Sequence, residues 1–303
     1  MPDFSSIERI LQSKFKEGES FVLDKDTYTI IESGKPKPSS GECKTDLYLL
    51  AKNNKIKKEF KVSIKLSNYE FLENKISRER AEEILGSHWS KIISESTLSI
   101  KDLFPVNELI IYSTKHKSYT LKLGWKFEIF NDTTRALKVF PNLSHQQKIE
   151  VLSGLNLPND KKNALVNGIC ITNSGIADYI LEVKDENQIL NLDLDSIISL
   201  IKPISIFAKN MSNMNFGFTA LNYRSDKDKW DGDRPLAVWV DWKLDSGKLL
   251  GQIMFVDPLT KKGNEIGNNI KVLLGELGIK KTKIKYNELV KNIDKSLTIH
   301  TTN

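Results

Sequence analysis

Two short apolar segments joined by a lysine-rich turn constrain the fold of this chain more than any other feature. The first segment reads "DLYLLAK" (46–52), the second reads "FKVSIKL" (60–66), and "NNKIKKE" separates them. Runs of six or seven residues that are rich in apolar and β-branched side chains, bounded by a polar turn, are typical of paired β-strands. We therefore predict an antiparallel hairpin over residues 46–66.

The predicted hairpin brings together residues from its two ends. In an antiparallel pair, the start of one strand lies beside the end of the next, so Asp46 and Lys65 are expected at the same edge. Side chains alternate between the two faces of a strand, which places Ser63 on the face of Lys65 and turns Ile64 the other way. The sequence thus predicts one shared polar site at this edge.

The chain around the hairpin has a mixed pattern. A helix is predicted over 7–15, a strand over 27–31, and a loop in "ESGKPKPSSGE", where prolines, glycines and serines cluster. Helical spacing of apolar residues begins at Asn68. Ser77 is a candidate N-cap for the helix in "RERAEEILG", which carries Glu79 in its first turn and has Gly86 just beyond its end.

The second half of the chain also alternates between strand and helix patterns, which predicts an α/β protein. We divide the whole chain into two regions. Residues 1–135 are predicted to form a mixed four- to five-stranded sheet flanked by helices, and residues 136–303 an elaborated α+β region. A hairpin turn is predicted at "DSGK" (245–248). Further strands are predicted at 108–114, 118–130, 177–184, 234–244 and 248–257, and helices at 144–155, 159–169 and within 267–296.

Composition narrows the chemistry. Two cysteines and four scattered histidines among 303 residues exclude a thiolate-rich zinc site and a disulfide framework. The N-terminus lacks the pattern of a signal peptide and no apolar run is long enough to cross a bilayer, so we expect a soluble, cytoplasmic protein without membrane contact. A net charge of +6 is compatible with a polyanionic partner such as DNA.

The edge residues have the composition of a phosphodiesterase site. Hydrolysis of a phosphodiester by a divalent metal needs carboxylates to hold the ion, and a cation near the water or the phosphate assists. An acid at the start of one strand, followed after a turn by a strand that ends in acid-X-Lys, resembles the PD-(D/E)XK nuclease superfamily, which includes most type II restriction endonucleases. Asp46 matches the first acid and Lys65 the lysine, but Ser63 stands at the position of the second acid.

The resemblance also indicates where the missing second acid can come from. A subset of these nucleases reads Ser-X-Lys and takes its missing carboxylate from the following helix. Thirteen residues separate Lys65 from Glu79, which makes Glu79 the expected second ligand of Mg²⁺, beside Asp46. Glu42 and Glu70 are alternatives, and Glu8 and Glu17 flank the first helix, where related nucleases keep a glutamate.

The resemblance implies a restriction-endonuclease-like core that cleaves double-stranded DNA with Mg²⁺, with catalytic Asp46, Lys65 and Glu79 and a supporting Ser63. Enzymes of this kind commonly act as homodimers. The alternatives are a phage or mobile-element nuclease, such as a homing or repair enzyme, and a DNA-binding protein without catalysis. Candidate DNA contacts combine lysine, arginine and aromatic side chains: Lys55, Lys57 and Lys58 in the hairpin turn, and Tyr223, Arg224, Lys229 and Arg234 in the second region.

Overall fold

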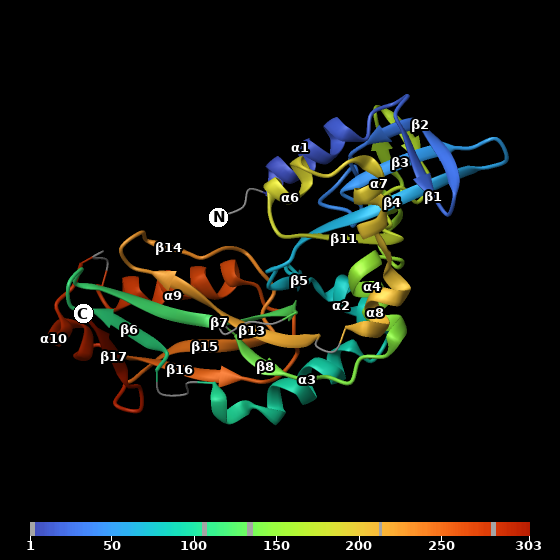
Figure 1. Ribbon diagram of the computed structural model, residues 1–303. Helices are drawn as coiled ribbons and strands as arrows, with labels where there is room; N and C mark the ends of the chain where they lie inside the picture. The colour runs from blue at the N-terminus through green and yellow to red at the C-terminus, as the bar shows by residue number, and fades with distance from the viewer. Residues whose placement is uncertain (1–3, 105–107, 132–135, 212–213, 280–282) are drawn as a thin grey trace. The chain divides into compact units, whose positions relative to one another are not determined.

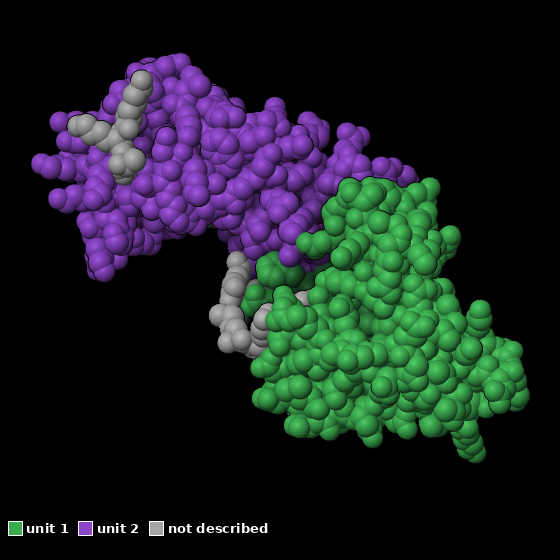
Figure 2. Space-filling model, turned by 90° about the horizontal axis from the view of Figure 1, so that it is seen from above, with its two compact units in different colours: residues 1–72, 142–214 green, residues 73–141, 215–303 purple. Residues whose placement is uncertain are grey.

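The chain forms a mixed α/β structure with two compact units. The computed structural model describes residues 4–104, 108–131, 136–211, 214–279 and 283–303. Helices and strands alternate along the whole chain (Figure 1). The first unit contains residues 1–72 and 142–214, and the second contains residues 73–141 and 215–303 (Figure 2). The units therefore do not follow the predicted division at residue 135, because each is assembled from two stretches of chain.

The first unit is built on a six-stranded mixed sheet in the order β1-β2-β3-β4-β11-β12. The first four strands are antiparallel, β11 runs parallel to β4, and β12 is antiparallel to β11. The sheet has one or two strands more than the sequence predicts. Its strands are β1 (Ser20–Leu23), β2 (Asp26–Gly34), β3 (Leu47–Lys52), β4 (Lys57–Leu66), β11 (Tyr179–Val183) and β12 (Lys202–Pro203).

Helices of the first unit share one apolar core with this sheet. Helix α1 (Phe4–Lys14) buries Ile7 and Leu11, one turn apart, against Leu49 and Val62 of the central strands. Ile189 of α6 (Glu186–Leu190) and Ile197 of α7 (Leu194–Leu200) join the same cluster. The remaining elements of this unit are α4 (His145–Ser153), α5 (Asn159–Lys162), α8 (Ile204–Asn210) and the hairpin β9 (Ala164–Val166) and β10 (Ile169–Ile171).

The second unit is organised around a larger sheet whose main path is β14-β13-β7-β15-β16. Strand β7 (Ser118–Phe130) pairs with β13 (Asn215–Arg224) along most of its length. Helix α9 (Gly263–Glu276) packs on β15. The other elements are β6 (Ile110–Ser113), β8 (Leu137–Val139), β14 (Lys229–Trp230), β15 (Val238–Asp245), β16 (Lys248–Met254), β17 (Ile299–Thr302), α2 (Arg78–Leu85), α3 (Trp89–Ser99), α10 (Tyr286–Val290) and the 3-10 helix η1 (Lys101–Leu103).

Two predicted helices are wrong. The stretch from Asn68 forms strand β5 (Phe71–Glu73), and the helix α2 begins only after the predicted cap Ser77, whose Oγ accepts from the Arg80 N–H at 3.2 Å. Within 159–169, only α5 is helical. The Asn-Gly pair at 167–168 has positive φ values of 49° and 87° and turns the chain into the β9–β10 hairpin.

Candidate functional site

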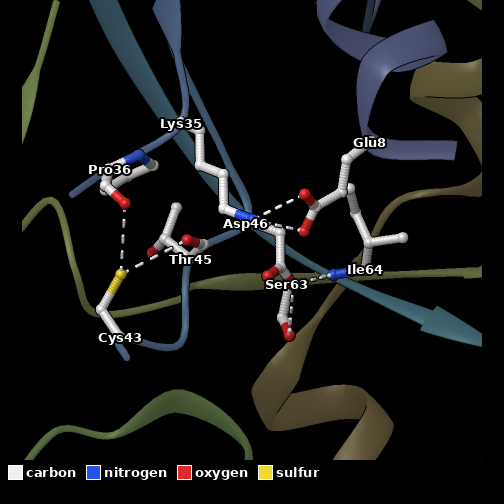
Figure 3. A network of polar contacts seen from close by, with 8 residues as sticks. All are labelled: Glu8, Lys35, Pro36, Cys43, Thr45, Asp46, Ser63 and Ile64. Atoms are coloured by element: carbon white, nitrogen blue, oxygen red, sulfur yellow. Dashed lines mark hydrogen bonds and ion pairs between the residues drawn. The ribbon is translucent and has the colours of Figure 1, made fainter. Parts of the chain in front are cut away.

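The structure places Asp46 at the entrance of β3, beside β4. Leu47 is opposite Val62 in the antiparallel register, and the Asp46 N–H donates to the Val62 carbonyl at 2.9 Å. The Oδ2 atom of Asp46 accepts from the backbone N–H of Ile64 at 2.8 Å and lies 3.4 Å from the Ser63 hydroxyl (Figure 3). The hairpin predicted from the sequence is confirmed, and its second strand holds the Asp46 carboxylate.

Several charges surround this carboxylate. Burial has the largest effect and raises the pKa of Asp46 to about 6. The positive charge of Lys65, the hydrogen bond from Ile64 and the charge of Lys35 lower the pKa of Asp46, while the negative charge of Glu8 raises it. Asp46 is therefore a poorly solvated acid whose ionised form depends on nearby cations.

Ser63 and Lys65 lie on the polar edge of β4. Ser63 is buried, with 1% of its surface exposed, while Lys65 is half-buried. Lys65 stands opposite Glu182 in the parallel register with β11. Within the described ranges, the Lys65 amino group has no hydrogen-bond or salt-bridge partner. Its charge acts on Asp46, and the amino group is available to an anionic ligand.

Glu8 adds a second carboxylate to the Asp46 site from helix α1. It follows the core residue Ile7 and is itself buried at 9% exposure. Its two oxygens accept from the Lys35 amino group at 2.7 and 2.6 Å, and its charge acts on Asp46 (Figure 3). The apolar face of α1 fixes this placement, because Ile7 and Leu11 anchor the helix on the sheet.

Lys35, which sequence reasoning missed, completes the group. It follows β2 directly, in the loop that the sequence marks only as proline- and glycine-rich. Nearby, the Cys43 Sγ lies 3.8 and 3.5 Å from the carbonyl oxygens of Pro36 and Thr45, so this loop is tied to the start of β3. A lysine just after a strand carries no signal of its own, and only the tertiary structure reveals that it faces Glu8.

Glu79, the predicted second ligand, stays a prediction. It belongs to α2 of the second unit, is exposed, and has a lowered pKa because of a hydrogen bond with Ser77. The alternatives Glu42 and Glu70 belong to the first unit, in the exposed loop before β3 and just before β5. In the described part of the chain, no group of three or more His, Cys, Asp and Glu side chains is arranged to hold a metal ion.

A cleft of about 920 Å³ in the first unit includes Lys35 in its wall. Its lining combines cationic, anionic and apolar side chains from α1, the end of β2 and the β9–β10 hairpin. Lys16 and Lys37 line it with Lys35, and Glu17 and Glu32 are also present. Lys35, which contacts Glu8, therefore also borders a cleft that contains other lysines.

Two of the three hairpin lysines predicted to contact DNA are exposed. Asn53 closes the β3–β4 turn, since its Oδ1 accepts from the N–H groups of Lys55 and Ile56 at 2.9 and 2.8 Å. Lys55 and Lys57 are exposed, whereas Lys58 places its amino group over the ring of Phe60.

The side chains of the second unit that are predicted to contact DNA differ in how far other residues of the protein already bind them. The buried Tyr223 donates its hydroxyl to Asp228 at 2.8 Å, and Arg224 forms an ion pair with Asp231 at 2.5 Å. Lys229 is exposed and Arg234 is half-buried. Tyr223 is therefore a core residue of this sheet, and Arg224 is positioned by its aspartate.

Comparisons with known proteins add no relative. The chain matches no protein-family model, no curated protein and no solved structure. In the described ranges, no helix has the length and apolar character needed to span a membrane.

Proposed function

We propose that this protein is a Mg²⁺-dependent endonuclease that cleaves double-stranded DNA, of the type II restriction class. The observation that carries the proposal is the contact of Asp46 with β4. The Asp46 carboxylate accepts a hydrogen bond from the Ile64 N–H, and the positive charge of Lys65 acts on it from the same edge. Asp46 and Lys65 are also the two groups to which the sequence pattern points.

The donor set suits a hard divalent cation. Mg²⁺ is commonly held by one or two protein carboxylates, with waters and substrate phosphates as its other ligands. Asp46 and Glu8 supply two carboxylates, both within reach of the Lys35 charge. We propose Glu8 as the second ligand in place of Glu79. When bound, Mg²⁺ would neutralise charge on the scissile phosphate and lower the pKa of a water molecule.

The protein's own groups have separate roles in this proposal. The Ile64 N–H and the Ser63 hydroxyl orient the Asp46 carboxylate. Lys65, which has no bonded partner among the described residues, contacts a nonbridging phosphate oxygen or the attacking water, where a positive charge stabilises the transition state. The mixed sheet with its covering helices supports an α/β core, which we propose to be restriction-endonuclease-like, and a homodimer would present two such sites to the two DNA strands.

Two observations favour the alternative of a DNA-binding protein without catalysis: Ser63 stands at the position of the usual acid, and Lys35 neutralises Glu8. Incubation of supercoiled plasmid with the purified protein separates the two. We expect nicked and linear DNA with Mg²⁺ and none with EDTA. DNA binding without any metal-dependent cleavage would contradict the nuclease proposal.

The products also distinguish the kinds of nuclease. A restriction enzyme gives discrete fragments that end at one short sequence, whereas a repair enzyme cuts at altered structures. A homing enzyme requires a long site and leaves most plasmids intact. We expect discrete fragments, and sequencing of their ends identifies the site.

A further inference from the structure

Lys35 makes a two-point contact with the buried Glu8 carboxylate. Its Nζ atom lies 2.7 Å from Oε1 and 2.6 Å from Oε2. The Glu8 side chain is 11% exposed, while the Lys35 side chain is 42% exposed. One partner is therefore fixed in the protein, and the other is a long, flexible side chain with access to solvent.

The same ammonium group is near the second carboxylate. The charge of Lys35 acts on Asp46 as well as on Glu8, and Figure 3 shows the amino group turned towards this pair. A cation that contacts one buried carboxylate and lies near a second one occupies the kind of position in which a metal ion would be bound.

We propose that the Lys35 ammonium stands in for a divalent cation in the metal-free protein, and that a metal must displace it from Glu8 in order to bind. This inference rests on the proposed function, because it takes Glu8 and Asp46 as the ligands. The ion pair keeps the buried Glu8 carboxylate compensated when no metal is present. The ion pair weakens the apparent metal affinity. The apparent dissociation constant equals the intrinsic one divided by the fraction of molecules in which Lys35 has left Glu8.

The structure provides a place for the displaced amino group. Lys35 lines the cleft of about 920 Å³ together with Lys16 and Lys37. A side chain that leaves Glu8 stays in this wall, where a DNA phosphate is a suitable partner for it. Metal binding would thus release a cation for the substrate, next to the site of cleavage.

Direct binding of Mn²⁺, measured without DNA by electron paramagnetic resonance of the free ion, tests the inference. Lys35→Met should bind Mn²⁺ on the order of tenfold more tightly than the wild type, because the competitor is gone. Lys37→Met is the matched control: it removes the same charge from the same cleft and should change the affinity by less than about twofold. Lys35→Arg keeps a competing cation and should remain as weak as the wild type.

The outcomes separate this inference from the proposed function. If the wild type binds Mn²⁺ and Lys35→Met binds it no more tightly, displacement of Lys35 is wrong and the metal site stands. Equal tightening in Lys37→Met would also overturn the inference, since general charge would then explain the effect. If none of the proteins binds Mn²⁺, both the inference and the metal-dependent function are wrong.

Discussion

The Oδ2 atom of Asp46 accepts a hydrogen bond from the backbone N–H of Ile64 at 2.8 Å. This bond joins the first residue of the predicted site to the strand that carries Ser63 and Lys65. Because it comes from the backbone, it fixes the carboxylate whatever side chains occupy positions 63 and 65. The acid is held in place at the edge of the sheet, and burial opposes its ionisation.

The first prediction concerns stability and pH. The pKa of Asp46 is raised to about 6, so between about pH 4 and pH 6 the folded state binds more protons than the unfolded state. The free energy of unfolding therefore falls as the pH rises through this window. Above about pH 6, the ionised Asp46 lowers the free energy of unfolding by on the order of 3 kcal/mol.

Asp46→Asn removes this loss of stability, and the amide oxygen can still accept the hydrogen bond from the Ile64 N–H. In EDTA at pH 7.5 we expect its melting temperature to exceed that of the wild type, and we expect the difference to disappear near pH 4. Calorimetry at the two pH values checks this. A variant that is less stable than the wild type at pH 7.5 would show that nearby cations already compensate the carboxylate in full.

The second prediction separates the two candidate glutamates. Glu8→Gln should lower the rate of Mg²⁺-dependent cleavage on the order of a hundredfold, because it removes the carboxylate that the structure places beside Asp46. Glu79→Gln should cut within a few fold of the wild type, since that side chain is exposed on α2. Single-turnover cleavage measures both. The reverse order of effects would restore Glu79 as the ligand.

The third prediction concerns affinity for DNA. Lys55 and Lys57 are exposed at the tip of the β3–β4 hairpin, so their replacement by alanine should weaken binding equally for all sequences. The slope of log K against log salt should fall by about 0.9 for each phosphate that the protein no longer neutralises. Fluorescence anisotropy at several salt concentrations gives the slope. An unchanged slope would assign these lysines to solubility.

The fourth prediction concerns a buried ion pair in the second unit. Arg80 is 7% exposed and contacts Glu73 at 3.2 Å and Glu83 at 2.9 Å. Arg80→Met should destabilise the protein by about 3 kcal/mol, because it removes a buried cation that contacts two carboxylates. Urea denaturation measures the loss of stability. Arg78→Met, on the exposed side of the same helix, is the control and should change stability by less than about 1 kcal/mol.

Local sequence patterns predict the hairpins but not the pairing of distant strands. The β3–β4 hairpin and the Ser246-Gly247 turn follow from local patterns, and both are confirmed. The pairing of β11 with β4 joins residues more than a hundred positions apart, and no local pattern encodes it. The two-part units follow from such long-range pairing, which is why a single boundary at residue 135 does not describe them.

Residues that complete the site depend on tertiary structure in the same way. The sequence offers Glu8 as one of several candidate carboxylates through the resemblance alone, and its position beside Asp46 results from the packing of Ile7 and Leu11. Lys35 has no pattern at all. A glutamate on the helix after the hairpin is what the sequence predicts for the second ligand; this residue, Glu79, belongs to α2 of the second unit, and its role stays a prediction.

In the proposed nuclease, Lys65 acts in the chemistry at the Asp46 edge. The most direct test is the single-turnover rate of DNA cleavage by Lys65→Ala in Mg²⁺, with Lys57→Ala as the control on the same strand and DNA binding measured in Ca²⁺. We predict that Lys65→Ala binds DNA within a few fold of the wild type and cleaves it about a hundredfold to a thousandfold more slowly, while Lys57→Ala cleaves at the wild-type rate. Cleavage by Lys65→Ala at the wild-type rate would contradict the account.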